Sequence, residues 1–284
     1  MIDTPVQSGW LANLDLKIDN VGGVARITRR RHLGPLLVQR AFYPEGAHAT
    51  APMAEPCHVY LVHPPGGIAS GDDLRLDVRV TEGAHALLTT PAAGKFYRRG
   101  TAGDARLIQS LRVDGAALEW LPQENIFYPN AAAELSTRVC LSGGSKFVGW
   151  EIACFGLPAS GGTLESGGIR QGFELWLDGR PLLLDRVTIQ EASLAAAWGL
   201  GGHSTLGTWV GFPATLQDLA AARAVVDTTC GDSTAACTLV DGALVCRGLG
   251  GRADRLKQVF VELWKGLRPS LIGREAVPPR VWAT

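Results

Sequence analysis

Residues 63–74, HPPGGIASGDDL, combine a histidine, three glycines and two aspartates between stretches that resemble β-strands. Glycine-rich loops can bind phosphate, and clusters of histidine and aspartate can bind a metal ion. A phosphate loop needs a helix directly after it, with its N-terminus facing the anion. The sequence LRLDVRV follows instead and alternates like a strand, which argues against a nucleotide site. The prolines and glycines predict a rigid connection between two strands, which can bring His63 and Asp72 at its ends close together.

Two other stretches resemble catalytic motifs but depart from them at required positions. The pair Gly94-Lys95 resembles the end of a P-loop, yet Thr89 stands where that motif has glycine and Phe96 where it has serine or threonine. The sequence GHSTLG around Ser204 approaches the G-x-S-x-G motif of serine hydrolases, but leucine replaces the last glycine. An enzyme that uses Ser204 is kept as an alternative.

The six histidines do not have the spacing of a closed metal site. They stand at positions 32, 48, 58, 63, 85 and 203 without an H-x-H or H-x-x-x-H pair, which argues against structural zinc. Oxygen and imidazole ligands suit divalent ions such as nickel, so a weak site built from His63, Asp72, Asp73 or Glu174 stays open. A turn or a solvated strand edge is the alternative for the two aspartates.

Composition narrows the class of protein. The chain of 284 residues carries 27 basic and 27 acidic side chains, and this zero formal charge gives no general attraction to nucleic acid or to an anionic membrane. Four arginines within 26–31 form a local cluster, for which an exposed strand edge is the favoured interpretation. The uncharged stretch 192–217 contains glycines, a histidine and a proline, and is a poor membrane span. Six cysteines without a C-x-x-C pair, behind a start without a secretion signal, predict free thiols in a cytoplasmic protein.

Strands joined by turns should dominate the fold. The 35 glycines and 16 prolines interrupt short apolar runs along most of the chain. Asp-Gly pairs at 114–115, 178–179 and 241–242 indicate turns, and at least the last two should be tight hairpins. A two-residue turn at the third pair places Cys237 opposite Cys246, with a structural pair favoured over a redox switch.

Two helices are expected, both in the last third of the chain. Residues 215–226 combine a threonine N-cap with alanine-rich turns. Residues 253–267 carry apolar side chains at helical spacing, and Gly266 and Pro269 are expected to end this helix. No repeat or low-complexity linker divides the chain, so 1–284 is interpreted as one mainly β domain.

Five segments, in order along the chain, resemble one family, the urease accessory protein UreD, which is called UreH in some organisms. The segments are HPPGGIASGD (63–72), TTPAAGKFYR (89–98), LEWLPQENIFYPNA (118–131), DGRPLLLDR (178–186) and LRPSLIGREAVPPRVWAT (267–284). The resemblance implies many short strands stacked in roughly perpendicular, β-helix-like layers, with one or two α-helices near the C-terminus. It also implies that the chain is not an enzyme.

The resemblance further implies partners and a cargo. Members of the family are expected to bind apo-urease and the helical accessory protein UreF, which in turn recruits the GTPase UreG. The assembly is expected to pass nickel to a urease active site built around a carbamylated lysine. No tightly bound cofactor is implied, only nickel in transit, and neither nucleic acid nor a membrane is an expected partner.

A nickel carrier needs ligands weak enough to release the ion. On this basis His63, Asp72 and Glu174 are the first candidates to line a polar, water-filled path through the β-domain. Glu174 alternates with apolar neighbours in FELWL, so its alternative is a position facing solvent.

Partner contacts are predicted for Lys95, Phe96, Tyr97 and Arg98, because aromatic and arginine side chains are frequent at interfaces, and for Glu124 in LPQEN. The alternative for GKFYRR is a strand with its aromatic side chains packed inside and its basic groups outward.

The chain departs from the family pattern at a few positions. Ser70 stands where glycine is usual, and Leu157 and Gly162 stand where arginine and glutamate are expected. Residues 129–131, PNA, replace a turn that often carries aspartate and glycine. The tryptophan in PPRVWAT predicts that the C-terminus is tied down on the domain.

Overall fold

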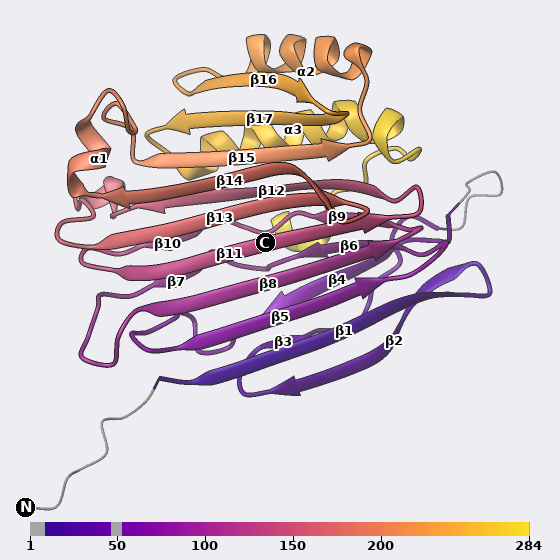
Figure 1. Cartoon of the computed structure of the whole chain (residues 1–284), viewed down its shortest axis with the longest axis horizontal. Coiled ribbons are helices and arrows are strands. Elements are labelled where there is room, and N and C mark those ends of the chain that lie inside the picture. Colours follow the sequence, from indigo (N-terminus) through magenta and orange to yellow (C-terminus); the bar gives the residue numbers. More distant parts are fainter. Residues whose placement is uncertain (1–8, 47–52, 284) are drawn as a thin grey trace, which may run out of the picture.

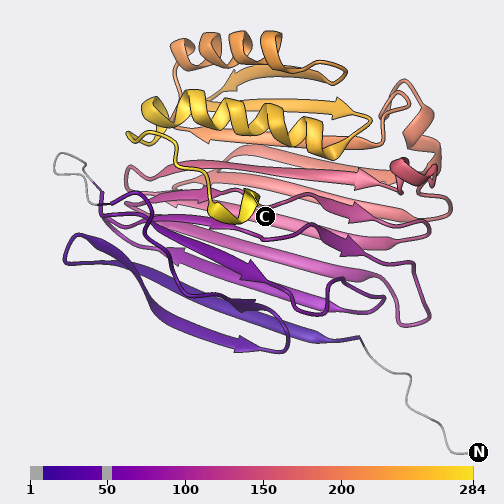
Figure 2. The same cartoon turned by 180° about the vertical axis from the view of Figure 1, so that it is seen from behind.

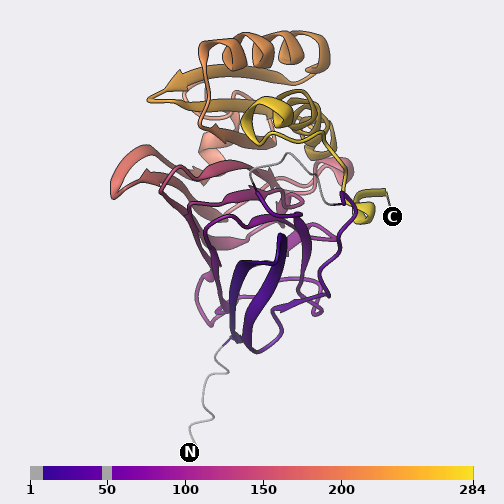
Figure 3. The same ribbon diagram turned by 90° about the vertical axis from the view of Figure 1, so that its right-hand side faces the viewer.

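The computed structural model describes residues 9–46 and 53–283 of the chain. Two β-sheets face each other, and helices cover the far side of one of them (Figures 1, 2 and 3). The seven-stranded sheet contains β1 (Leu11–Val21), β2 (Val24–Leu33), β5 (Asp73–Val80), β8 (Ala105–Asp114), β11 (Ala132–Ser142), β13 (Gly168–Leu177) and β14 (Arg180–Gln190). The ten-stranded sheet contains β3 (Leu37–Val38), β4 (Cys57–Val62), β6 (His85–Thr89), β7 (Gly94–Phe96), β9 (Ala117–Trp120), β10 (Asn125–Phe127), β12 (Lys146–Phe155), β15 (Thr205–Phe212), β16 (Thr234–Val240) and β17 (Ala243–Gly250). The helices are α1 (Glu191–Ala195), α2 (Leu216–Thr229) and α3 (Ala253–Leu271), with short 3-10 turns η1 (Pro158–Ser160) and η2 (Arg280–Ala283).

The chain crosses repeatedly from one sheet to the other between β4 and β13. Strands β5, β8, β11 and β13 lie side by side and parallel in the seven-stranded sheet. Strands β4, β6, β9 and β12 do the same in the ten-stranded sheet. Each further crossing therefore stacks a new coil on the previous one. The prediction of a mainly β, single domain of stacked strands is confirmed.

The main core fills the space between the two sheets. Successive side chains of a strand point to opposite faces, so Leu14 and Leu16 of β1 are buried inside while Asp15 and Lys17 face outward. The same alternation runs through β5, where Arg75 lies on the outer face. The seven-stranded sheet thus has an apolar inner face and a charged outer face.

Helices α2 and α3 cover the outer face of the ten-stranded sheet and enclose a second apolar cluster there (Figure 2). α2 begins after Thr215, which forms a capping box with Asp218, so the predicted start of this helix is confirmed.

The C-terminal end of α3 differs from the prediction. Pro269 lies inside the helix, which continues to Leu271. Proline removes one main-chain donor from this last turn. Leu267, Arg268 and Leu271 are nevertheless buried beneath the helix and hold the turn in place. The expectation that Gly266 and Pro269 end the helix is therefore wrong.

The last two Asp-Gly pairs form tight hairpins as predicted. Asp178 and Asp241 both adopt positive φ, at 47° and 48°, in the two-residue turns of β13–β14 and β16–β17. The second turn places Cys237 directly opposite Cys246, also as predicted. The first pair, at 114–115, instead connects β8 of one sheet to β9 of the other.

Several surface features also follow the sequence. Residues 26–31 lie in β2 at the edge of the seven-stranded sheet, as predicted for the arginine cluster. Leu157 and Gly162 are paired in an isolated bridge, so the charged residues expected at these positions would be direct neighbours. No helix within 9–46 and 53–283 is long and apolar enough to span a membrane.

The C-terminal segment is tied down, as predicted. The Trp282 ring of η2 packs between Trp150 and Trp264, with ring-centroid distances of 5.8 and 5.7 Å. Its Nε1 donates to Thr89 Oγ1 at 3.0 Å, which anchors the segment to β6.

Candidate functional site

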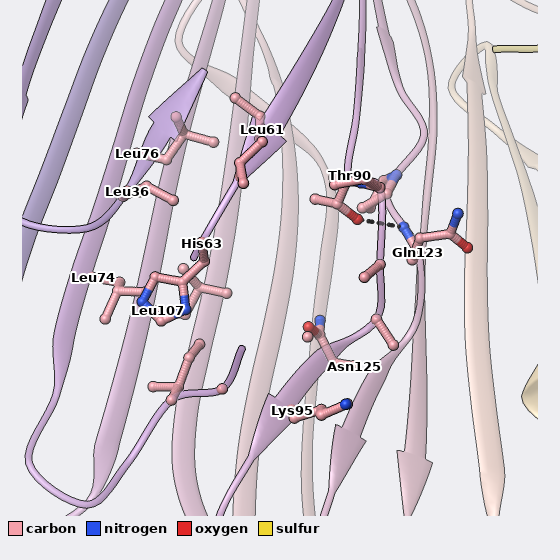
Figure 4. A pocket seen from close by; sticks show the side chains of 18 of the residues that line it. Leu36, Leu61, His63, Leu74, Leu76, Thr90, Lys95, Leu107, Gln123 and Asn125 are labelled. Atoms are coloured by element: carbon pink, nitrogen blue, oxygen red, sulfur yellow. Dashed lines mark hydrogen bonds between the residues drawn. The ribbon is translucent and has the colours of Figure 1, made fainter. Parts of the chain in front are cut away.

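A cavity of about 380 Å³ lies between the two sheets, beside the 63–72 loop (Figure 4). Its wall is mostly apolar, as is usual for small-ligand cavities. The polar side chains in the wall are those of His63, Thr90, Lys95, Gln109, Gln123, Asn125 and Glu151. We call this space the main cavity.

The 63–72 loop is a rigid connection, as the sequence predicts. Gly66 and Gly71 have φ values of +78° and +79°, which side-chain-bearing residues rarely adopt. A Cβ on Gly67 would lie 2.2 Å from the Tyr97 ring, so a larger residue there would displace this ring. Ile68 pairs with β7 through two main-chain hydrogen bonds, which fixes the loop over the mouth of the main cavity.

Asp72 is a structural carboxylate within this loop. Its Oδ1 accepts from the Trp10 N–H and its Oδ2 from the Ala69 N–H, both at 2.7 Å. The side chain is 5% exposed and does not belong to the wall of the main cavity. Asp72 therefore holds the loop against the start of β1.

His63 faces the main cavity from the end of β4 (Figure 4). Its buried Nε2 has no hydrogen-bond partner. Burial lowers the pKa of His63, although the nearby Asp72 charge acts in the opposite direction. The ring is thus neutral at pH 7 and offers a free nitrogen lone pair or N–H toward the cavity. His63 and Asp72 do lie near each other, but only His63 faces the open space.

Glu151 of β12 is the carboxylate that sequence reasoning missed. It accepts hydrogen bonds from Thr137 and, at 2.9 Å, from Gln171 Nε2, and no described lysine or arginine pairs with it. Burial raises the pKa of Glu151 to about 7; the two donors oppose this, and the Asp185 charge adds to it. The signal in the sequence was a lone acidic residue in the apolar run FVGWEIACF.

Glu151 also lies between the main cavity and a smaller space next to it. It borders a second, narrow space of about 10 Å³, which has room for roughly one water molecule. Val187 and Leu206 separate this neck from an outer groove of about 470 Å³ near the exposed Trp198. Polar groups line the neck, including Asp185, which pairs with Arg247 at 2.5 Å.

Glu174 lies on the other side of the seven-stranded sheet. Its neighbours Phe173 and Leu175 point into the core, so Glu174 points to the outer face. Its carboxylate accepts from Arg186 at 2.6 Å and from Arg138 at 2.8 Å. Burial alone would raise the pKa of Glu174, but these donors and the Trp176 indole lower it to about 2. The structure does not bring Glu174 together with His63.

The residues predicted for partner contact divide between inside and outside. Phe96 is fully buried and stacks on Phe127 at 4.8 Å, so the prediction of a partner contact is corrected for this side chain. Lys95 lines the main cavity, whereas Tyr97 is 38% exposed.

Arg98 is exposed beside an open, polar depression. Glu124 lies half-buried in the loop between β9 and β10, and its charge acts on the nearby Lys257. Partner contact stays a prediction for Lys95, Tyr97, Arg98 and Glu124.

A second buried polar centre fixes α3 to the ten-stranded sheet. Arg268 donates to both oxygens of Glu119, at 2.8 and 2.9 Å, and to Glu45 Oε1 at 2.6 Å. His85 and His58 lie 2.7 and 2.8 Å from Glu119 and Glu45. Burial alone would raise the pKa of Glu119, but the Arg268 charge and the His85 hydrogen bond hold it well below its usual value.

No other catalytic or metal-binding constellation was found in the described parts of the chain. Ser204 Oγ donates to the Gly251 carbonyl at 3.1 Å, and no described histidine or carboxylate side chain is hydrogen-bonded to it. The described residues hold no cluster of three or more histidine, cysteine or acidic side chains placed to bind a metal ion.

Comparison with known proteins gives a consistent result. The model of the UreD urease accessory protein family matches residues 11–283. The urease accessory protein UreD of Pseudomonas putida strain W619 is 42% identical over 278 residues, which cover 98% of this chain and 95% of that protein. The protein of the same name from Klebsiella aerogenes is 38% identical and covered to 99% on both sides. The protein of that name from Vibrio parahaemolyticus is 40% identical, with 98% of this chain and 97% of the relative covered.

Proposed function

Because the chain belongs to the UreD urease accessory protein family, we propose that it is a non-catalytic scaffold of urease maturation. In this role it binds apo-urease and UreF in the cytoplasm, joins UreG through UreF, and helps to deliver nickel. A stacked β-domain with a rigid core suits a scaffold, since its surfaces keep fixed relative positions. The exposed Tyr97 and Arg98 are candidate contact residues for one of these partners.

We further propose that nickel in transit passes through the space between the sheets. The observation that carries this proposal is Glu151, a buried carboxylate without a cationic partner, at the junction of the main cavity and the neck. A negative group without a counter-charge attracts a divalent cation in a medium of low dielectric constant. His63, with its unpartnered ring nitrogen, is the ligand at the mouth.

The chemistry of this route suits transfer rather than storage. Carboxylate, amide and hydroxyl oxygens from Glu151, Gln109, Gln171 and Thr137 are weak ligands for nickel compared with a thiolate cage. An ion held by them exchanges readily with water. Glu174 has no part in this route, because its carboxylate faces the outer surface and is occupied by two arginines.

Co-purification tests the scaffold proposal. The full chain, tagged at one end, is co-expressed with apo-urease, UreF and UreG, and the captured complex is analysed by native mass spectrometry. We expect urease and UreF to be captured by the chain, and UreG to be captured only when UreF is present.

The Ser204→Ala variant is the control for the enzyme alternative. It should assemble and activate urease like the wild type, because its hydroxyl only caps a carbonyl. Capture of none of the three proteins would contradict the scaffold role, and loss of activation by Ser204→Ala alone would revive the hydrolase alternative.

A further inference from the structure

None of the helices in the described part of the chain covers the outer face of the seven-stranded sheet (Figure 1). Charged side chains stand on it in rows that run across the strands, one residue from each strand. Two of these rows differ in the order of their charges. In one row the neighbouring charges pair with each other across the strands, and in the other they do not.

One row alternates in sign. Arg170 of β13, Glu134 of β11, Arg106 of β8 and Asp73 of β5 are direct cross-strand neighbours. The successive nitrogen-to-oxygen distances are 3.8, 3.5 and 3.7 Å. Opposite charges on neighbouring strands stabilise a sheet, so this row needs no partner.

The other row carries a single sign. Arg29 of β2, Lys17 of β1, Arg79 of β5 and Arg112 of β8 are direct cross-strand neighbours, in that order. We call this row the cationic ladder. Like charges in directly opposed positions destabilise a sheet. We therefore expect the ladder to have a function that offsets this loss of stability.

Carboxylates beside the ladder compensate for only part of its charge. Arg29, Lys17 and Arg79 pair with Asp15, Asp19 and Asp114 at 2.8, 2.9 and 2.9 Å, all at half-exposed positions. Arg112 is exposed, and within 9–46 and 53–283 no ion-pair or hydrogen-bond partner of its guanidinium is present. Arg112 is the last cation of the ladder, and the next positions in the same row are Cys140 of β11 and Trp176 of β13.

We propose that the cationic ladder is the docking surface for an acidic helix of a protein partner in urease maturation. Neighbouring strands lie about 4.8 Å apart, so the four side chains span about 14 Å. Acidic residues at positions i, i+3, i+7 and i+10 of a helix span about 15 Å along one face. Such a helix, lying across the strands, places one carboxylate opposite each cation. Trp176 at the end of the row supplies an aromatic contact of the kind frequent in interfaces.

A protein fits this surface better than a nucleic acid or a membrane. The chain has zero formal charge, so no long-range field draws a polyanion to it. The carboxylates that flank the ladder keep its cationic groups in fixed positions, which suits a partner with a defined pattern of charges better than a uniform row of phosphates.

Charge reversal at Arg112 provides the test. Arg112→Glu places a carboxylate opposite Arg79, so the variant should fold with an unchanged or higher melting temperature. Affinities of the full chain for purified apo-urease and, separately, for purified UreF are measured at several salt concentrations. Arg255→Glu, on the exposed side of α3, is the matched control because it makes the same change in net charge.

We expect Arg112→Glu to weaken binding of one of these partners by about tenfold or more and to flatten its salt dependence, with Arg255→Glu unchanged. Carbodiimide cross-links from Lys17 should map to carboxylates three or four residues apart in one partner helix. Wild-type affinity of Arg112→Glu for both proteins would overturn the proposal. So would binding of duplex DNA or phosphatidylglycerol vesicles that is lost in the same variant.

The inference rests on the proposed scaffold function, and the two fail in different ways. If the wild-type chain binds neither apo-urease nor UreF, the scaffold function itself is wrong and the docking surface is rejected with it. If the wild type binds and Arg112→Glu binds equally well, only the docking surface is wrong.

Discussion

Glu151 is a buried carboxylate whose hydrogen-bond donors are neutral side chains, so its negative charge is costly inside the protein. Glu174 has the same sequence surroundings, a single acid among apolar neighbours, and yet it is paired with two arginines on the outer face. The two residues therefore predict opposite dependences of stability on pH.

The pKa of Glu151 is raised from an ordinary value of 4.5 to about 7 in the folded state. Folding favours its neutral form, so the energetic cost of burying the charged form is absent below about pH 4, grows between pH 4.5 and 7, and is nearly constant above pH 7. Glu151→Gln should therefore match the wild type at pH 4 and exceed its free energy of unfolding by about 3 kcal/mol at pH 8. Urea unfolding at a series of pH values measures this.

Glu174→Gln is the control with the opposite sign. The pKa of Glu174 is lowered to about 2 on folding, so its contribution is present above pH 4.5 and is lost as the pH falls through 2. The variant should be less stable than the wild type at pH 7 and equal to it in strong acid. A constant difference between Glu151→Gln and the wild type at every pH would contradict the burial of Glu151 without a cationic partner.

Asp72 and Asp73 are adjacent acids with unequal roles. Asp72→Ala leaves the Trp10 and Ala69 N–H groups without their acceptor and should lower the free energy of unfolding by about 3 kcal/mol. Asp73 pairs with Arg75 on the exposed face, so Asp73→Ala should cost less than about 1 kcal/mol. Equal losses in chemical unfolding of the two variants would show that Asp72 does not hold the loop.

At the scale of elements, α3 depends on a buried ion pair rather than on its apolar face alone. Arg268→Met leaves Glu119 buried without its arginine partner and Glu45 with Arg274 alone, at 4.0 Å, and should lower the free energy of unfolding by about 3–5 kcal/mol. Lys265→Met, one turn away on the exposed side, should change it by less than about 1 kcal/mol. Guanidinium unfolding followed by tryptophan fluorescence distinguishes the two, and a Lys265→Met loss as large as that of Arg268→Met would contradict this role.

Elements that are determined by residues close together in the sequence could be predicted. The Asp-Gly turns require positive φ, and the apolar stripe of 253–267 has helical spacing, so both hairpins and α3 follow from short-range chemistry. The end of α3 did not follow, because Arg268 and Leu271 are anchored by residues far away in the sequence. The five-residue α1 was not predicted, since a helix so short has little periodicity to detect.

At the scale of the whole molecule, the stacked β-fold followed from the pattern of turns and from the family resemblance, but the lining of the interior did not. The register of β12 and β13 in different sheets decides that Glu151 faces inward and Glu174 outward. A period of two residues defines two faces of a strand without saying which of them meets the core. The Glu119–Arg268 ion pair could not be predicted from local sequence patterns either, because its two residues lie 149 positions apart.

Nickel loading tests the central claim most directly. Purified apo-urease is matured by complexes that contain the wild-type chain, Glu151→Gln or Glu174→Gln, and the nickel bound per urease active site is measured by mass spectrometry. We predict that the wild type and Glu174→Gln load urease equally, whereas Glu151→Gln assembles the same complex but slows loading by about tenfold, the effect of losing one charge-assisted contact. Loading by Glu151→Gln at the wild-type rate would contradict a nickel route between the sheets.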